Sequence, residues 1–177
     1  MKWVIDMSVT EHKKEAPRVV RCKVITISDT RTIDTDKSGK LMIDLLKEAG
    51  HEVVSYEIVK DEKEAIRTAI LRGCEQADID VVLTNGGTGI AKRDVTIETV
   101  KEIIEKEIVG FGELFRMLSY TEDIGSAAIL SRAIAGVAND TAIFSTPGSS
   151  GAVRLAMTKL ILPEISHVVR EIRKDLR

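Results

Sequence analysis

The chain has 177 residues, of which 44% are hydrophobic, 31% are charged and only 3% are aromatic. A chain of this length builds one well-packed core, so we expect a single domain with an interior of Ile, Val, Leu and Ala. The formal net charge is -2 at pH 7, and basic residues are interspersed with acidic ones, which excludes nucleic acid as a main partner.

Residues 1–18 show no sustained hydrophobic periodicity, and we predict a flexible N-terminal extension that contacts a neighbouring subunit. The single domain is then residues 19–177. In its first half, β-branched runs alternate with amphipathic helical patterns. The predicted strands are residues 21–28, 52–59 and 79–84, and the predicted helices are residues 36–50 and 61–76. This alternation is typical of right-handed βαβ units, and hence of a parallel sheet covered by helices.

The second half combines helical patterns with a hairpin signal. The helical patterns cover residues 95–108, 110–122 and 149–176. Pro163 interrupts the last of them, which predicts a kink or two helices. The runs "AIAGVA" and "TAIFST" are separated by "ND", a tight-turn sequence, so we expect a β-hairpin and an antiparallel part of the sheet. The predicted fold class is α/β with three layers, in which a mostly parallel sheet carries helices on both faces.

Two properties of the sequence favour the cytoplasm. No stretch reaches the ~18 consecutive apolar residues of a membrane-spanning helix, and the first residues lack the apolar centre and cleavage site of a signal peptide. We therefore expect a cytoplasmic protein with no membrane partner, in which Cys22 and Cys74 stay reduced. The histidines lack the spacing of metal ligands, so no zinc site is predicted.

Polar clusters lie at the ends of predicted strands, which is where ligands bind in a parallel sheet. The clusters are "SDT" (28–30), "KDE" (60–62), "TNGGTG" (84–89) and "STPGSS" (145–150). Gly86, Gly87 and Gly89 allow backbone N–H groups to approach an anion, and the following helix adds the favourable end of its dipole. The third cluster thus predicts a phosphate-binding loop, although it matches neither the P-loop nor the dinucleotide fingerprint.

Simpler interpretations exist for the same residues. The glycine-rich stretch is also typical of a turn that binds nothing, and Ser149 or Ser150 fits the cap of a helix. Asp61 and the residue three positions later form a D-x-x-E pattern that favours an N-cap, and Asp94 also precedes a predicted helix.

Six stretches of the chain resemble one known family. They are "ISD", "VKDE", "TNGGTGIAKRDVTIE", "FGELFR", "AILSRAIAG" and "STPGSSGAV". They are similar to motifs of the MoaB/MogA family of molybdenum cofactor biosynthesis proteins, and the resemblance as a whole covers residues 21 to about 165. The chain departs from the family pattern at Ile97 and Ser150, where the family has proline. Both changes affect the rigidity of a loop rather than a reactive group.

The resemblance implies a molybdopterin-binding fold and the adenylylation of molybdopterin with Mg-ATP, before molybdate is inserted. It also implies that Asp61 and Asp94 hold Mg2+ and act in catalysis. The residues that would bind molybdopterin and ATP are Ser28, Asp29, Thr84, Gly86, Gly87, Thr88, Gly89, Arg93, Pro147, Gly148, Ser149 and Ser150. The expected protein partners are copies of the same chain, in a homotrimer or homohexamer, and the enzyme that inserts molybdate.

Two alternatives keep the fold and change the function. One is a non-catalytic paralogue or carrier that binds molybdopterin for a partner enzyme, and the presence of both acids argues against it. The other is the nucleotide-processing fold of competence-damage-inducible proteins, in which the loop has GGLG and paired Asp in place of the GGTG and RDVT found here.

Overall fold

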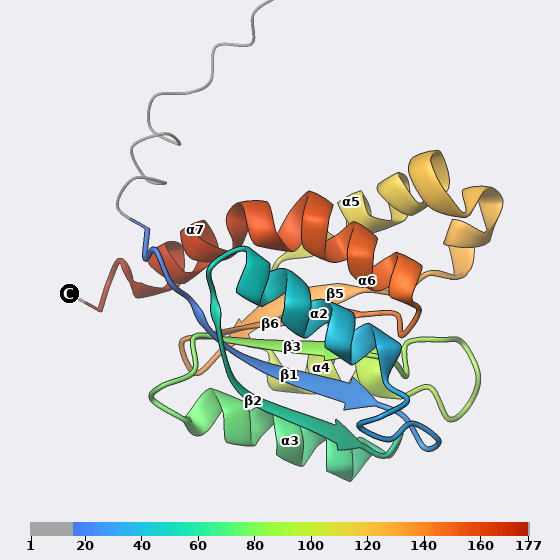
Figure 1. Ribbon diagram of the computed structural model, residues 1–177, viewed down its shortest axis with the longest axis horizontal. Helices are drawn as coiled ribbons and strands as arrows, with labels where there is room; N and C mark the ends of the chain where they lie inside the picture. The colour runs from blue at the N-terminus through green and yellow to red at the C-terminus, as the bar shows by residue number, and fades with distance from the viewer. Residues whose placement is uncertain (1–15, 177) are drawn as a thin grey trace, which may run out of the picture.

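The computed structural model describes residues 16–176, so most of the predicted extension at residues 1–18 lies outside the described part of the chain. The described residues build a six-stranded sheet with helices on both faces (Figure 1). The strands are β1 (Arg21–Ile27), β2 (Glu52–Val59), β3 (Val81–Asn85), β4 (Lys106–Glu107), β5 (Ile134–Ala138) and β6 (Thr141–Thr146). Their order across the sheet is β2-β1-β3-β6-β5-β4. This arrangement confirms the predicted three-layer α/β fold.

The sheet has a parallel part and an antiparallel part. β1 pairs with β2 and with β3, and β3 pairs with β6, all in parallel. β5 runs antiparallel to β6, and the two strands are joined by Asn139 and Asp140, whose φ angles are 48° and 56°. Positive φ at both central residues is what a type I′ hairpin turn requires, and Asn and Asp tolerate it. The predicted hairpin is confirmed.

Six α-helices cover the sheet. They are α2 (Lys37–Glu48), α3 (Lys63–Glu75), α4 (Thr96–Ile103), α5 (Val109–Leu118), α6 (Ser150–Ala156) and α7 (Leu162–Arg173). α3 and α4 lie on one face, and the other four lie on the opposite face (Figure 1). Each face has its own largely aliphatic core, with residues such as Leu46 and Val153 on one side and Ile70 and Val100 on the other. No helix within residues 16–176 is long and apolar enough to cross a membrane.

One predicted helix is too long. The pattern over residues 95–108 predicts a continuous helix, but α4 ends at Ile103 and the short strand β4 follows. The N–H groups of Glu105 and Ile108 donate to the carbonyl oxygens of Val137 and Ala135 at 2.8 and 2.7 Å, so these residues pair with β5. Pairing with the sheet edge therefore overrides the local helical pattern.

The helical pattern over residues 149–176 is divided, but the division lies before the proline that predicts it. A π-helical segment at Met157–Ile161 separates α6 from α7. Pro163 lies in the first turn of α7, directly after this π-helical segment. A second π-helical segment (Ser119–Asp123) replaces the last turn of the helix predicted at residues 110–122, and a 3-10 helix (Gly125–Leu130) follows it outside the predicted helix.

Both cysteines lie in the interior. Cys22 and Cys74 are free and buried. Burial raises the pKa of the Cys22 thiol to about 12 and that of the Cys74 thiol to about 11. The two thiols therefore stay protonated and unreactive at neutral pH.

His51 makes the stability of the fold depend on pH. Its Nδ1 accepts a hydrogen bond from the Val20 N–H at 3.3 Å, and burial lowers the pKa of the ring. A histidine with a lowered pKa binds protons more readily in the unfolded chain, so its stabilising contribution is present above about pH 6.5 and is lost as the pH falls through the folded-state pKa. We expect the free energy of unfolding in urea to fall more steeply on acidification in the wild type than in His51→Gln. An equal fall in both proteins would contradict this role.

Candidate active site

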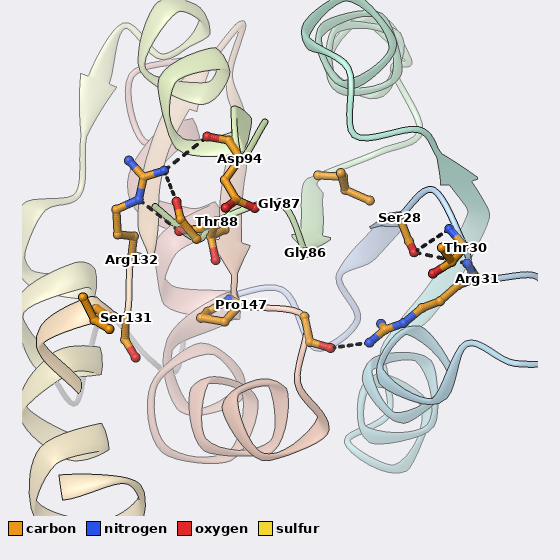
Figure 2. Close-up of a pocket in the computed structure, with 14 residues that line it drawn as sticks. Ser28, Thr30, Arg31, Gly86, Gly87, Thr88, Asp94, Ser131, Arg132 and Pro147 are labelled. Carbon is orange, nitrogen blue, oxygen red and sulfur yellow. Dashed lines mark hydrogen bonds between the residues drawn. The ribbon is translucent and has the colours of Figure 1, made fainter. Parts of the chain in front are cut away.

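A cavity of about 450 Å³ lies beyond the carboxyl ends of β1, β3 and β6 (Figure 2). The chain leaves β1 for β2 on one side and later returns to β3 on the other side. The cavity therefore lies at the topological switch point, where ligands bind in open α/β sheets. Its lining residues are Ile27, Ser28, Thr30, Arg31, Gly86, Gly87, Thr88, Gly89, Asp94, Leu130, Ser131, Arg132, Pro147 and Gly148.

The glycine loop, residues 86–94 after β3, is pressed against the end of β1. The φ angle of Gly86 is 103°, a value that only glycine adopts without strain. A Cβ at this position would lie 2.2 Å from the carbonyl oxygen of Ile27. Thr96 at the start of α4 holds the loop from the other side, since its hydroxyl donates to the Gly86 carbonyl at 3.0 Å and its N–H to the Gly87 carbonyl at 3.1 Å. Glycine is therefore required where two backbones approach closely.

The same loop presents N–H groups that the fold does not use. No hydrogen bond within residues 16–176 uses the N–H of Gly87, Thr88 or Gly89, and all three residues line the cavity. Successive N–H groups of this kind form a concavity that binds anions. Their position supports the phosphate-binding interpretation over a turn that binds nothing.

Replacing Gly86 with alanine should destabilise the protein by about 2–4 kcal/mol, because the backbone conformation is strained for alanine and the new methyl group overlaps a carbonyl oxygen. Thermal unfolding measures the change. Gly50 provides a matched control, since its φ is 84° and a Cβ there would meet nothing within 4 Å. Gly50→Ala should cost only about 1 kcal/mol. Equal losses in the two variants would show that the close approach is unimportant.

Asp61 and Asp94 reach the glycine loop from two directions. A Cβ built on Gly87 would lie 2.7 Å from Oδ1 of Asp61, and a Cβ built on Gly89 would lie 2.5 Å from Oδ2 of Asp94. Neither acid caps a helix, because the N-caps of α3 and α4 are the residues that follow them. The cap interpretation of both aspartates is wrong.

Asp61 has a buried oxygen without a partner. Its Oδ1 makes no hydrogen bond within the described residues. Burial raises the pKa of this carboxyl group and the charge of Asp94 raises it further, while the backbone of Val95 lowers it in part. Asp94 has a hydrogen-bond partner, since its Oδ2 accepts the N–H of Ala91 at 2.8 Å. Two neighbouring carboxylates, one with an unpartnered oxygen, fit a hard divalent cation such as Mg2+.

The two acids form a partial set of ligands. Residues 16–176 contain no cluster of three or more His, Cys, Asp or Glu side chains that could hold a metal ion. A cation at Asp61 and Asp94 would therefore take its remaining ligands from phosphate and water oxygens. Mg2+ is commonly bound in this way in nucleotide sites.

The predicted binding residues after β1 separate into two groups. Ser28 lines the cavity and Asp29 does not. Asp29 forms an ion pair with Arg93, and its Oδ1 accepts the N–H of Asp61 at 3.1 Å. Asp29 and Arg93 therefore tie the loop after β1 to the loops that carry the two acids, and both lie outside the cavity wall.

The predicted residues after β6 separate in the same way. Pro147 and Gly148 line the cavity, whereas Ser149 and Ser150 do not. Oγ of Ser149 accepts the N–H of Ala152 at 3.1 Å, so this serine caps α6. The cap interpretation is confirmed for Ser149.

Thr84 lies inside the sheet instead of at the cavity. It is fully buried in β3, and its hydroxyl donates to Oγ of Ser145 on β6 at 2.7 Å. Its side chain therefore joins two strands and does not face the ligand position predicted for it.

The structure adds lining residues that the sequence patterns do not single out: Thr30, Arg31, Leu130, Ser131 and Arg132. Arg31 is fixed by the carboxylate of Asp36 at 3.4 Å and the carbonyl of Gly148 at 2.9 Å. Burial opposes ionisation of Asp36, but hydrogen bonds from Thr26, Tyr56, Gly39 and Ser38 outweigh it and lower the pKa. Arg31 thus joins the loops after β1 and β6.

The one sequence feature that points to Arg31 and Arg132 as site residues is their position next to or within the quoted motifs. Arg31 directly follows "SDT", and Arg132 lies within "AILSRAIAG", a stretch that carries the family resemblance. Nothing in the residue pattern shows that these two residues line one cavity from opposite sides (Figure 2).

Comparison with known proteins agrees with this fold. The family model described as "Probable molybdopterin binding domain" matches residues 23–167. The chain is 70% identical over 169 residues to molybdenum cofactor biosynthesis protein B of Bacillus subtilis (strain 168), with 96% of this chain and 99% of that protein covered.

Two solved structures extend the comparison. The crystal structure of a molybdenum cofactor biosynthesis protein B has a TM-score of 0.88 and 67% identity, covering 90% of this chain and 99% of that one. The tungsten cofactor synthesizing protein MoaB from Pyrococcus furiosus has a TM-score of 0.80 and 39% identity, covering 89% and 99%. The chain therefore belongs to the MoaB/MogA family of molybdenum cofactor biosynthesis proteins.

Proposed function

We propose that this protein acts in molybdenum cofactor biosynthesis by binding molybdopterin in the cavity at the switch point and adenylylating it with Mg-ATP. The observation that carries the proposal is the meeting of two features at the glycine loop. Its N–H groups at residues 87–89 make no hydrogen bond within the described part of the chain, and the carboxylates of Asp61 and Asp94 lie beside it. The first feature suits phosphate groups and the second suits the cation that accompanies ATP. Membership of the family supports molybdopterin as the second ligand.

The proposed reaction joins two polyanions. An oxygen of the terminal phosphate of molybdopterin attacks the α-phosphorus of ATP and forms a phosphoanhydride bond. The bond from the α-phosphorus to the oxygen that bridges to the β-phosphorus breaks, and pyrophosphate leaves with the electron pair. Because the attacking oxygen is already negative, no side chain has to remove a proton. The protein must instead bring the two anions together and offset their charge.

The residues of the cavity fit these tasks. The N–H groups of Gly87, Thr88 and Gly89 bind phosphate oxygens and stabilise the charge that develops on them. Mg2+ held by Asp61 and Asp94 would supply further positive charge at the phosphates. A volume of about 450 Å³ falls within the usual range of small-molecule sites, roughly 300–1,000 Å³.

One incubation distinguishes the activity from its alternatives. The protein is mixed with molybdopterin and Mg-ATP, and the products are analysed by mass spectrometry. An adenylylated molybdopterin is the expected product. Binding of molybdopterin without this product would identify a carrier, and modification of the nucleotide alone would indicate nucleotide processing.

We also propose that the chain forms a homo-oligomer, a trimer or a hexamer. Exposed apolar side chains are concentrated on α5 and the two short helices after it, where they include Val109, Leu114, Met117, Tyr120, Ile124, Ile129 and Leu130. Met117, Tyr120 and Ile129 line one shallow depression, so at least this part of the surface is continuous. Such patches on a folded protein mark association surfaces. Light scattering measures the number of subunits.

In the proposed pathway the protein is cytoplasmic and passes its product to the enzyme that inserts molybdate. An adenylylated product is a reactive anhydride, so direct transfer to that enzyme would protect it from hydrolysis. The predicted contact of residues 1–18 with a neighbouring subunit remains a separate proposal. Light scattering on a chain that begins at Val19 tests it.

A further inference from the structure

Arg132 donates hydrogen bonds to the backbone of the glycine loop. It lies just before β5, and its Nε donates to the carbonyl oxygen of Thr88 at 3.0 Å. Its Nη2 donates to the carbonyl oxygens of Gly89 at 2.5 Å and of Asp94 at 3.4 Å. Figure 2 shows the guanidinium group turned toward this loop. One side chain thus binds three carbonyl groups of a loop in which residues 87–89 line the cavity.

These contacts fix the directions of the N–H groups. In a trans peptide the carbonyl of one residue and the N–H of the next residue point in opposite directions. Holding the carbonyl of Thr88 therefore orients the N–H of Gly89, a cavity-lining residue whose N–H has no hydrogen-bond partner among residues 16–176. Holding the carbonyl of Asp94 orients the N–H of Val95, which faces the carboxyl group of Asp61. Arg132 is in this way connected both to the N–H groups of the glycine loop and to the carboxyl group of Asp61.

Glu98 on α4 holds Arg132 in place. Its two carboxylate oxygens accept from Nη1 at 2.5 Å and from Nη2 at 3.3 Å, which is the two-pronged geometry that a guanidinium group allows. The hydrogen bond from Arg132 lowers the pKa of Glu98, so this pair is ionised at neutral pH. A carboxylate beside an anion site repels the anion and so weakens its binding. The presence of Glu98 at this position is therefore explained by a role other than direct anion binding. Positioning of Arg132 is such a role.

We propose that Arg132 and Glu98 form a positioning pair that sets the shape of the glycine loop for phosphate groups, with Arg132 acting through the backbone and not as a direct phosphate ligand. The identity of the anion in this inference rests on the proposed function. The role of Arg132 in shaping the loop does not rest on it, because the contacts of Arg132 with the loop are present without a ligand.

The Glu98→Gln variant separates the two possible roles of Arg132. If Arg132 binds phosphate directly, removing the adjacent negative charge should leave the affinity for an anion unchanged or raise it. If the pair positions the loop, the same change should lower the affinity. The probe is inorganic pyrophosphate, measured by titration calorimetry. We expect at least ~10-fold weaker binding in Glu98→Gln and in Arg132→Lys, the scale found when a group that orients a ligand is removed.

The controls lie outside the pair. Glu102→Gln removes the same charge one turn further along α4, where the side chain pairs with Lys63 at 2.7 Å. Arg72→Met removes a positive charge from α3, where Arg72 lies 3.8 Å from Glu57. Both controls should bind pyrophosphate within about twofold of the wild type, since surface charges of this kind act weakly. Lysine does not replace Arg132 because its single ammonium group lacks the planar fork that reaches several acceptors.

A second readout needs no ligand. Amide hydrogen exchange is measured at Ala91, Asp94 and Thr96, whose N–H groups are hydrogen-bonded within the loop or to it. Exchange at these amides should accelerate in Arg132→Lys and Glu98→Gln, while the melting temperature and exchange in the sheet stay close to wild type. A purely structural role would lower the melting temperature and accelerate exchange throughout.

The outcomes are distinct. Unchanged or tighter pyrophosphate binding in Glu98→Gln overturns the proposal, as does unchanged exchange at the three amides in Arg132→Lys. If the wild type itself does not bind pyrophosphate, the phosphate-binding loop of the proposed function fails, and the exchange measurement still decides whether Arg132 shapes the loop.

Discussion

Replacing Asp94 with asparagine is expected to lower adenylyl transfer by ~100-fold or more at saturating Mg-ATP, the scale found when a preorganised electrostatic group is lost. The amide oxygen of asparagine can still accept the N–H of Ala91, so the loop should keep its shape. The negative charge is lost, and with it the attraction for Mg2+ beside the transferring phosphate. The protein should therefore remain folded and still bind molybdopterin. Pyrophosphate release and calorimetric titration measure the two properties separately.

The control for Asp94→Asn is Asp34→Asn, an exposed aspartate outside the cavity lining. Its activity should stay within about twofold of the wild type, since isolated surface charges contribute little. Turnover of Asp94→Asn within a factor of a few of the wild type would remove this residue from the reaction. The glycine loop would then be a binding feature only.

Replacing Asp61 with asparagine should lower adenylyl transfer by a similar factor, ~100-fold, and should also raise the thermal stability of the protein in the absence of Mg2+. The second effect follows from the environment of the carboxyl group. Burial and the charge of Asp94 raise its pKa, so its ionised form at neutral pH opposes folding. A neutral amide removes this penalty. Unfolding temperatures measured with EDTA and with Mg2+ test the effect, since the ion should stabilise the wild type and not the variant.

The double variant tests whether the two acids share one ion. If they do, Asp61→Asn with Asp94→Asn should lose far less than the product of the two single losses, because the second change removes a ligand from an ion that is already absent. Independent, multiplying losses would assign the two acids to separate tasks. A wild type that Mg2+ does not stabilise would argue against a metal site at these residues.

The fold could be predicted from the sequence because its signals are local. The continuous apolar run at β3 and the "ND" turn after β5 each specify structure within a few residues. β4 was missed because residues 106–107 become a strand only through hydrogen bonds to β5, a partner about 30 residues away in the sequence. Local patterns carry no information about such a partner.

Only part of the site could be predicted, because some of its residues are marked by local sequence patterns and others by contacts between distant residues. Gly86 and its neighbours form an unusual cluster in the sequence, and the structure places most of them at the cavity. Thr84 belongs to the same polar stretch and is predicted to bind the ligand, but strand alternation turns its side chain toward Ser145. Arg132 was missed because its role depends on contacts with carbonyl groups from residues 88–94, which become its neighbours only in the folded chain.

The most direct test of the central claim is the stoichiometry of one reaction with ATP labelled in its γ-phosphate. Adenylyl transfer breaks the bond between the α- and β-phosphates, so the account predicts one labelled pyrophosphate for each adenylylated molybdopterin, with no product when molybdopterin or Mg2+ is omitted. Release of labelled orthophosphate, or release of pyrophosphate that does not depend on molybdopterin, would contradict adenylyl transfer at this site.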